Sequence, residues 1–302
     1  MITRAVEVLR AGGLVAFPTE TVYGLGADAA NPRALRRLFE VKGRPTDHPV
    51  IVHVARAAQL DDFGRDVPDV AHAFAEAFWP GPLTIIVLRN PDRVAPEATG
   101  GRETVGIRVP DHPVALELLD AFGGGVAAPS ANRFGRVSPT TAQHVRDDLG
   151  ADVDVVLDGG PSAVGVESTI VDVSWPQPVV LRIGGISDDE LQRVAGTQLS
   201  RRIDGEVAAP GTLASHYAPD ARVELVQAGE VDARTAVLRA KGLNVGVLDA
   251  PRDPGDYARL LYRRLRELDR EGVDVILAVP PSDVTGMGAA VADRLRRAAT
   301  GR

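Results

Sequence analysis

Short apolar runs alternate with stretches of helical periodicity along residues 1–195, and this alternation restricts the chain to an α/β fold. Strands are predicted at 14–17, 50–54, 83–88, 104–109, 125–128, 153–157, 169–173 and 178–183. Helices are predicted at 3–11, 32–41, 67–78, 112–122, 140–149 and 187–194. Because the last three strands follow one another with only turns between them, the pattern favours a mixed sheet over a purely parallel one.

The rest of the chain divides into a linker and a second, smaller domain. Residues 196–220 contain several glycines and prolines and lack periodicity, which is typical of an interdomain linker. Beyond them, strands predicted at 221–226, 244–248 and 273–279 alternate with helices predicted at 230–241, 254–271 and 284–299. This order predicts a small α/β domain with a parallel sheet. The predicted domains are therefore 1–195 and 221–302, a division that 302 residues allow at ~150 residues per domain.

Composition excludes several classes of function. The chain contains no cysteine, which excludes disulfides, thiolate metal sites and cysteine nucleophiles. No run approaches the ~18 apolar residues of a membrane span, and the N-terminal residues lack the apolar core of a signal peptide. We therefore expect a cytoplasmic protein without a membrane partner. The net charge of −7 argues against a broad nucleic-acid-binding surface but leaves room for a local basic pocket.

The common catalytic motifs are missing from the sequence. It contains no GxxxxGK[ST] loop, GxSxG elbow or HExxH helix, which excludes ordinary P-loop, serine-hydrolase and zincin sites. The run GLGADA at 24–29 matches GxGxxA, but a dinucleotide fingerprint needs its first glycine directly after the strand, and residues 18–23 intervene here. No spacing of His, Asp and Glu indicates a metal held by the protein, so Mg²⁺ is expected only with a bound nucleotide.

Two polar runs near the N-terminus indicate a nucleotide site. PTETVYGLG at 18–26 follows an apolar strand, and KGRPTDHP at 42–49 places Lys42 and Arg44 on a turn constrained by glycine and proline. Polyphosphate requires fixed positive charge and main-chain donors, which such loops supply. The chain has two lysines, Lys42 and Lys241, so a lysine in this turn suggests a need for a compact ammonium. The alternative is an ordinary surface lysine.

Further polar residues lie near the ends of the predicted strands. Arg108 and Arg182 stand between apolar residues, and a buried cation requires an anionic partner. For either arginine alone an internal salt bridge is the ordinary explanation, so we infer a ligand site only from the whole set of polar runs. His53 is either a core histidine or a site residue, whereas His48 lies in the basic turn and is better placed for function.

Taken together, these runs resemble the threonylcarbamoyl-AMP synthase family in its two-domain form. The matching runs, in the family's order, are PTETVYGLG (18–26), KGRP (42–45), PVIVHV (49–54), TVGIRVP (104–110), APSAN (128–132), SPT (138–140), EST (167–169), LRIGG (181–185) and SHYAP (215–219). Each run is weak alone, but nine in sequence are specific. The resemblance implies a YrdC-like mixed, twisted sheet with helices and an open ligand cleft, followed by a small Rossmann-like α/β C-terminal domain.

The resemblance also implies a reaction and its residues. Such enzymes make L-threonylcarbamoyladenylate and pyrophosphate from L-threonine, bicarbonate or CO₂, and ATP with Mg²⁺, and a partner enzyme system transfers the threonylcarbamoyl group to tRNA. By motif, threonine would be held by Thr21, His53, Arg108, the backbone at Ala128, and Ser168. ATP would be held by Arg44, His48, Thr104, Ser130, Ser138, Arg182 and Tyr217. Lys42 and Arg44 would serve catalysis by offsetting phosphate charge, and the linker with Tyr217 would form a lid.

One departure and two alternatives accompany this resemblance. Family members often carry asparagine at the position of His48, where a neutral imidazole can replace one amide contact. The first alternative is a nucleotide- and RNA-binding module without adenylation activity, which the acidic net charge and the aromatic fraction of 4% disfavour. The second is a carbamoyltransferase domain, which is usually embedded among zinc-finger and acylphosphatase-like domains. Because of the acidic net charge and the low aromatic fraction, we expect no stable binding of nucleic acid.

Overall fold

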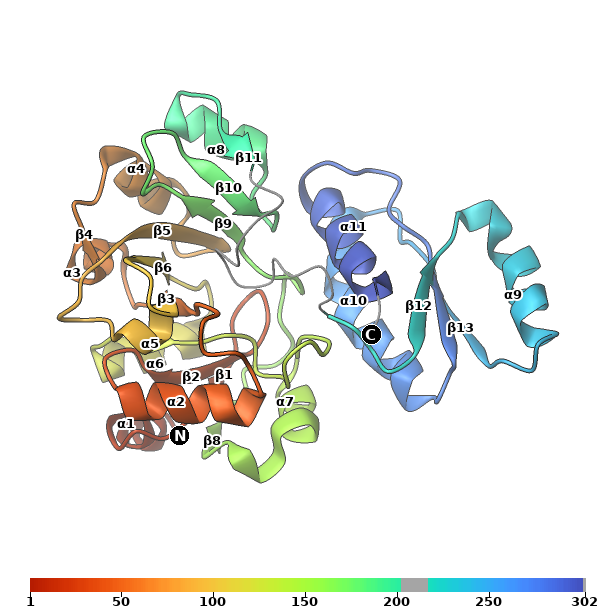
Figure 1. The fold of residues 1–302 in the computed structure, drawn as a ribbon, viewed down its shortest axis with the longest axis horizontal. Helices are drawn as coiled ribbons and strands as arrows, with labels where there is room; N and C mark the ends of the chain where they lie inside the picture. Colours follow the sequence, from red (N-terminus) through yellow and green to blue (C-terminus); the bar gives the residue numbers. More distant parts are fainter. Residues whose placement is uncertain (202–216, 301–302) are drawn as a thin grey trace.

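The computed structural model describes residues 1–201 and 217–300, which form a large mixed sheet and a small parallel sheet, each with helices (Figure 1). Within these ranges the large sheet contains β1 (Val15–Phe17), β2 (Gly24–Asp28), β3 (Ile51–His53), β4 (Gly64–Arg65), β5 (Leu83–Arg89), β6 (Thr104–Arg108), β7 (Val126–Ala127), β8 (Val155–Val156), β9 (Thr169–Asp172), β10 (Val179–Arg182) and β11 (Ser200–Arg201). Its helices are α1 (Ile2–Arg10), α2 (Pro32–Lys42), α3 (Leu60–Phe63), α4 (Asp69–Phe78), α5 (Pro96–Thr99), α6 (Pro113–Phe122), α7 (Ala142–Leu149) and α8 (Asp188–Ala195).

The large sheet is mixed, as the sequence predicts. Its strands lie in the order β11-β10-β9-β5-β6-β3-β7-β2-β1-β8, with β4 paired to β5. Strand β3 is parallel to β6 and β5 is parallel to β9, whereas β5 and β6 are antiparallel. Because β10 is antiparallel to β9, strands β3, β6 and β10 all run in the same direction. Their carboxyl ends carry His53, Arg108 and Arg182, so the topology directs three of the predicted site residues the same way.

Strand β2 was not predicted from the sequence. Its residues GLGAD carry two glycines and no β-branched side chain, so the run lacks the usual composition of a strand. The structure nevertheless places it between β1 and β7, where there is little room for side chains. A Cβ at Gly26 would lie 2.7 Å from Val126 Cγ1 and 2.9 Å from Phe17 Cε1. Packing of the neighbouring strands therefore explains the glycine.

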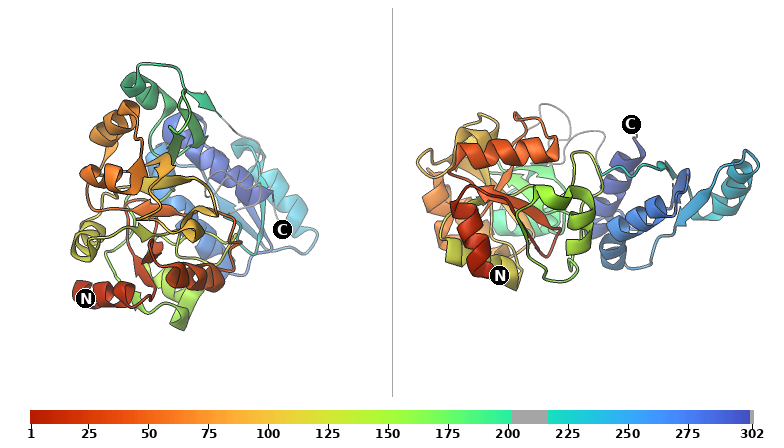
Figure 2. Two further views of the ribbon diagram at one scale, coloured as in Figure 1. Left: turned by 60° about the vertical axis from the view of Figure 1, so that its left-hand side comes forward. Right: turned by 90° about the horizontal axis from the view of Figure 1, so that it is seen from below.

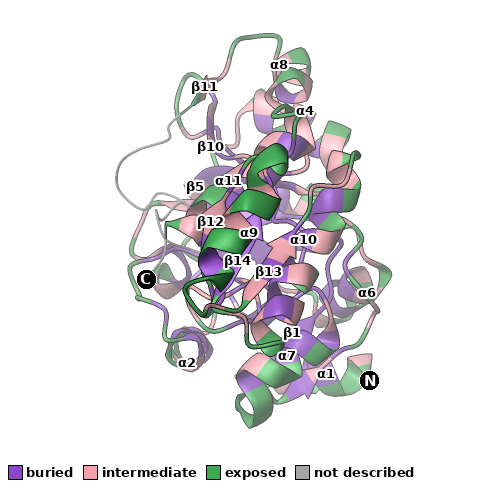
Figure 3. Ribbon diagram, turned by 90° about the vertical axis from the view of Figure 1, so that its right-hand side faces the viewer, coloured by how far each residue is buried: buried purple, intermediate pink, exposed green. Residues whose placement is uncertain are grey.

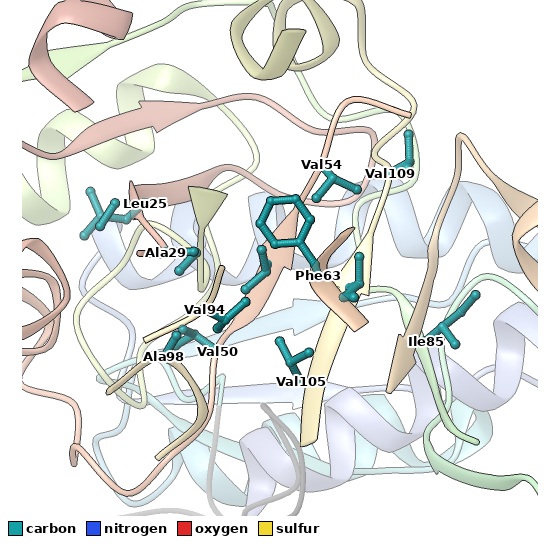
Figure 4. Packing of buried hydrophobic residues seen from close by; sticks show 14 of the residues in the cluster. Leu25, Ala29, Val50, Val54, Phe63, Ile85, Val94, Ala98, Val105 and Val109 are labelled. Atoms are coloured by element: carbon teal, nitrogen blue, oxygen red, sulfur yellow. The ribbon is translucent and has the colours of Figure 1, made fainter. Parts of the chain in front are cut away.

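Helices cover both faces of the sheet around β1. Val15 and Phe17 pack in a cluster with apolar residues of α1 and α6, whereas Ala16 packs in a second cluster with residues of α2. The second cluster also joins residues from β2, β5 and β6, which Figure 4 shows at close range. Burial on both faces explains why the β1 run is apolar throughout instead of alternating.

The C-terminal residues form a three-stranded parallel sheet in the order β12-β14-β13. Its strands are β12 (Arg222–Leu225), β13 (Val245–Leu248) and β14 (Val275–Ala278), and its helices are α9 (Val231–Arg239), α10 (Pro254–Arg270) and α11 (Gly286–Ala299). Helices α10 and α11 lie on the side of this sheet that faces the large sheet, and α9 lies on the far side (Figures 1 and 2). The parallel sheet agrees with the sequence pattern, and the Rossmann-like assignment remains a prediction.

The two α/β parts meet through α10 and α11. An apolar cluster joins Tyr217, Val22 and Val166 to buried residues of these helices, such as Leu261 and Val291. Helix α9, by contrast, buries only Leu238, and the face it presents in Figure 3 is largely exposed. Contact between the parts is thus concentrated on one side of the small sheet.

The division into domains remains a prediction. Residues 202–216 of the predicted linker and lid, at 196–220, lie outside the described residues. Of the linker residues that are described, Ser200 pairs in register with Val179 at the edge of the large sheet, and the Ala218 N–H donates to the Gly135 carbonyl at 2.9 Å. Among the described helices, none is long and apolar enough to cross a membrane.

Candidate active site

A cavity of about 550 Å³, including its open mouth, lies beyond the carboxyl ends of β3, β6 and β10. Open α/β sheets commonly bind ligands at such a position. Its lining residues are Thr19, Thr21, Val22, Gly24, Arg44, Ile51, His53, Arg108, Ala128, Pro129, Ser130, Glu167, Arg182 and Tyr217. The cavity therefore gathers runs that are widely separated in the sequence, including the two N-terminal runs and the residues after β7.

The hairpin between β1 and β2 supplies the hydroxyls. The Thr19 hydroxyl donates to the Val22 carbonyl at 2.6 Å, and the Thr19 and Thr21 hydroxyl oxygens lie 2.8 Å apart. These hydrogen bonds fold the turn so that both side chains are buried at the cavity wall. Thr21, predicted to contact threonine, is thus held in place before any ligand arrives.

Arg108 has an internal carboxylate partner and also lines the cavity. Its Nη2 lies 2.6 Å from Glu20 Oε1, and both side chains are buried. Glu20 Oε2 accepts a further hydrogen bond from the Asp111 N–H at 3.0 Å, and Arg108 Nε donates to the Gly81 carbonyl at 3.2 Å. The internal salt bridge is therefore confirmed, and because Glu20 fixes the guanidinium at the edge of the cavity, a role of Arg108 in ligand binding stays a prediction.

His53 lies beside Arg108 at the end of β3 and is a neutral imidazole. Burial, and then the charge of Arg108, lower its pKa to about 3. Its Nδ1 is buried without a hydrogen-bond partner among the described atoms, although the side chain lines the cavity. A buried polar atom of this kind ordinarily finds a partner, which a polar ligand in the cavity would provide.

The pKa of His53 leads to a prediction for its titration. Because the folded-state pKa lies below the ordinary value, His53 should stay uncharged as the pH falls from 8 to 5. The Hε1 resonance of its ring, assigned with a His53→Gln variant, should therefore not move over this range, and His53 should add no acidic limb to an activity profile near pH 6.5. An inflection between pH 6 and 7 would show that the ring is solvated or paired with an anion.

Of the two cations predicted for the basic turn, Arg44 follows α2 and lines the cavity, whereas Lys42 is the last residue of the helix. Gly43 ends the helix with φ 63°, the left-handed conformation that glycine adopts readily. Arg44 lines the cavity, and its Nη2 donates to the Pro49 carbonyl at 2.9 Å. Burial lowers the pKa of Arg44 to about 10, so the side chain is still a cation at neutral pH. Its guanidinium lies 5.7 Å from the centre of the Phe134 ring.

Lys42 is not one of the residues that line the cavity. Its Nζ donates to the carbonyls of Ser130 and Asn132, at 2.5 and 2.6 Å, and the side chain is buried. Burial, and then the charge of Arg44, lower its pKa well below the usual value for a lysine. The amine thus fixes the APSAN loop in this structure, and a direct role at the phosphates remains a prediction.

Arg182, which was predicted to bind ATP, contacts Ser168, which was predicted to bind threonine. Its Nε donates to the Ser168 carbonyl and its Nη2 to the Ser168 hydroxyl, both at 2.9 Å. The Ser168 and Thr84 hydroxyl oxygens lie 2.8 Å apart, and Ser168 is buried and is not one of the lining residues. Ser138, also buried, donates from its hydroxyl to Glu167 Oε1 at 2.7 Å.

The structure gathers some of the predicted residues and separates others. Eight of them line the cavity: Thr21, Arg44, His53, Arg108, Ala128, Ser130, Arg182 and Tyr217. Lys42, Ser138 and Ser168 contact or hold lining residues from behind. Thr104 lines a smaller neighbouring pocket that shares Ile51 with the cavity, and the His48 ring lies 5.6 Å from that of Phe134. The roles of these residues in binding threonine or ATP remain predictions.

Sequence reasoning missed Thr19, Glu20 and Glu167 as residues of this site. All three belong to the quoted runs PTET and EST. Glu20 and Glu167 were given no role because their partners are distant in the sequence, whereas Thr19 bonds locally to Thr21 and Val22. Among the described residues, no three His, Asp or Glu side chains converge as metal ligands. Mg²⁺ entering with ATP remains a prediction.

Two family models together match most of the chain. One, described as "Telomere recombination", matches residues 7–184, and the other, described as "Threonylcarbamoyl-AMP synthase, C-terminal domain", matches residues 186–300. Threonylcarbamoyl-AMP synthase of Pyrococcus abyssi is 41% identical over 97% of this chain and 92% of the relative. The Bacillus subtilis protein of the same name is 40% identical over 100% of this chain and 93% of the relative.

A solved structure is similar over both α/β parts. The crystal structure of P. abyssi Sua5 complexed with L-threonine is 40% identical to this chain, with a TM-score of 0.91, and the match covers 99% of this chain and 94% of that one. The similarity therefore extends to the arrangement of the whole described chain.

Proposed function

We propose roles for the residues of the cavity in this chain, which belongs to the threonylcarbamoyl-AMP synthase family. The reaction makes L-threonylcarbamoyladenylate from L-threonine, bicarbonate or CO₂, and ATP, and it releases pyrophosphate. One observation about the site supports these roles above others. Three buried arginines, Arg44, Arg108 and Arg182, line a single cavity. The ATP phosphates and the threonine carboxylate are anions, and the three guanidinium groups can offset both charges.

The threonine end of the cavity is assigned to Arg108, His53 and Thr21. The Arg108 guanidinium would bind the threonine carboxylate while Glu20 fixes its orientation. His53 Nδ1 and the Thr21 hydroxyl would contact the polar groups of threonine, together with the backbone at Ala128. Ser168 completes the threonine set that the family resemblance implies, and its hydroxyl accepts a hydrogen bond from Arg182.

The ATP end of the cavity is assigned to Arg44, Arg182, Ser130 and Tyr217. The two guanidinium groups would bind the phosphates, with Mg²⁺ brought by ATP offsetting further charge. His48, Thr104 and Ser138 complete the ATP set that the family resemblance implies. Burial raises the pKa of Tyr217 to about 12, so its phenol stays neutral beside the nucleotide.

The reaction requires positioning more than a protein nucleophile. The threonine amine attacks CO₂ and loses a proton, which gives a carbamate. A carbamate oxygen then attacks the α-phosphorus of ATP, and the bond to the β-phosphate oxygen breaks to release pyrophosphate. Fixed cations stabilise the charge on the phosphates during this transfer, and the aligned substrates avoid the entropic cost of meeting in solution. The product would pass to an enzyme system that modifies tRNA in the cytoplasm.

A threonine-dependent release of pyrophosphate tests the proposal. Purified protein with ATP, Mg²⁺ and bicarbonate should release pyrophosphate with L-threonine and not without it. Serine, which lacks the methyl group, should react about ten- to hundredfold less efficiently, and valine, which lacks the hydroxyl, less efficiently still. ATP binding without release under any condition would instead support the nucleotide- and RNA-binding module, and salt-dependent binding of bare tRNA would distinguish it further.

A further inference from the structure

Two side chains of the C-terminal part reach the wall of the cavity. Arg294 of α11 donates from Nε to Glu167 Oε2 at 2.9 Å, and Tyr262 of α10 donates from its hydroxyl to the same oxygen at 2.9 Å. Arg294 and Tyr262 are both fully buried, and Glu167 lines the cavity. The large and small sheets are thus joined by a buried carboxylate at the edge of the candidate active site.

The Glu167 carboxylate lines the cavity that is proposed to bind the ATP phosphates. Arg294 and then Arg182 are the cations whose charge offsets its burial, and together with hydrogen bonds they lower its pKa to about 2. An anion at this wall would repel phosphate unless a cation offsets it. Arg294 does so from behind the wall, where it also donates from Nη2 to the Ile183 carbonyl at 3.0 Å. Arg182, one residue earlier, lines the same cavity.

The same two side chains support Tyr217. The Arg294 guanidinium lies 5.3 Å from the centre of the Tyr217 ring, and the Tyr262 ring is stacked on it at 5.6 Å and 27°. Tyr217 has φ 62°, a conformation that a bulky side chain rarely adopts. Its surroundings must therefore impose its position, and Arg294 and Tyr262 form a large part of those surroundings.

We infer that Arg294 and Tyr262 are positioning residues for ATP, supplied by the C-terminal part of the chain. They hold Glu167 and Tyr217 at the cavity wall, and the Arg294 guanidinium offsets the charge of Glu167, so that a bound phosphate does not meet an uncompensated anion. This inference rests on the proposed function, because it names the side chains that complete the ATP end of the same cavity.

Calorimetric binding of ATP with Mg²⁺ to the full chain tests this inference. Arg294→Gln should weaken ATP binding by about tenfold or more, because it leaves Glu167 as a poorly compensated anion. Adding Glu167→Gln to that variant should recover a large part of the affinity, since it removes the anion. Tyr262→Phe, a milder change that keeps the stacked ring, should weaken ATP binding about threefold. Threonine affinity should change little in each variant.

Arg270→Gln serves as the matched control. Arg270 also joins the two parts, through an ion pair with Asp147, but it lies on the exposed surface and does not contact Glu167. Its loss should leave ATP affinity unchanged. The inference is wrong if Arg294→Gln binds ATP as the unmodified chain does, or if the double variant binds no better than the single one. Failure of the unmodified chain to bind ATP would instead contradict the proposed function.

Discussion

Replacement of Arg108 by methionine should lower kcat/KM for threonine by about a hundredfold or more, because the threonine carboxylate loses its charge-assisted hydrogen bonds in a buried site. The same change should lower the free energy of unfolding by about 3–5 kcal/mol, since Glu20 is left as a buried carboxylate without its cation. Pyrophosphate release at varied threonine concentration measures the first effect, and urea denaturation measures the second.

A second substitution separates these two effects. Glu20→Gln combined with Arg108→Met removes both charges, so most of the lost stability should return while threonine-dependent release stays low. Glu20→Gln alone should leave Arg108 charged but less firmly oriented, with a smaller loss of activity. A normal KM for threonine in Arg108→Met would restrict Arg108 to its salt bridge and place the carboxylate-binding group elsewhere in the cavity.

Local sequence pattern was sufficient for most of the fold and for part of the site. The predicted mixed sheet is confirmed. Apolar runs and helical periodicity predict it because the residues of each segment themselves show which of its faces is buried. Strand β2 was missed because its two glycines reflect the close packing of Phe17, Val126 and Ala128 against it, which no local pattern records. Propensity is a weak guide where tertiary contacts decide.

The candidate site shows the same division between local and distant information. Arg44 was predicted from its turn, and the structure does place it in the cavity. Lys42 was predicted from the same turn, yet its amine holds carbonyls of Ser130 and Asn132. The role of Glu167 depends on Arg294, which lies 127 residues further along the chain. Such contacts arise only when the two α/β parts meet, so sequence spacing could not predict them.

Arg44→Met should reduce kcat by about 10²–10³-fold, which is the usual cost of removing a fixed group that stabilises transition-state charge. Arg44 is a cation at neutral pH and lines the cavity, so its charge can act on the phosphates as pyrophosphate leaves. KM for threonine should change less than about threefold, because Arg108 and His53 are untouched. Steady-state kinetics with ATP and threonine varied in turn measures both quantities.

Lys42→Met is the informative comparison for Arg44→Met, because both residues are buried near the end of α2. The Lys42 amine is bonded to the APSAN loop, so its loss should shift Ser130 and raise KM for ATP more than it lowers kcat. A fall in kcat as large as that of Arg44→Met would show that the amine leaves these carbonyls and reaches the phosphates during turnover. A rise in KM for ATP with unchanged kcat in Arg44→Met would contradict its catalytic role, since equal binding of ground state and transition state does not accelerate the chemical step.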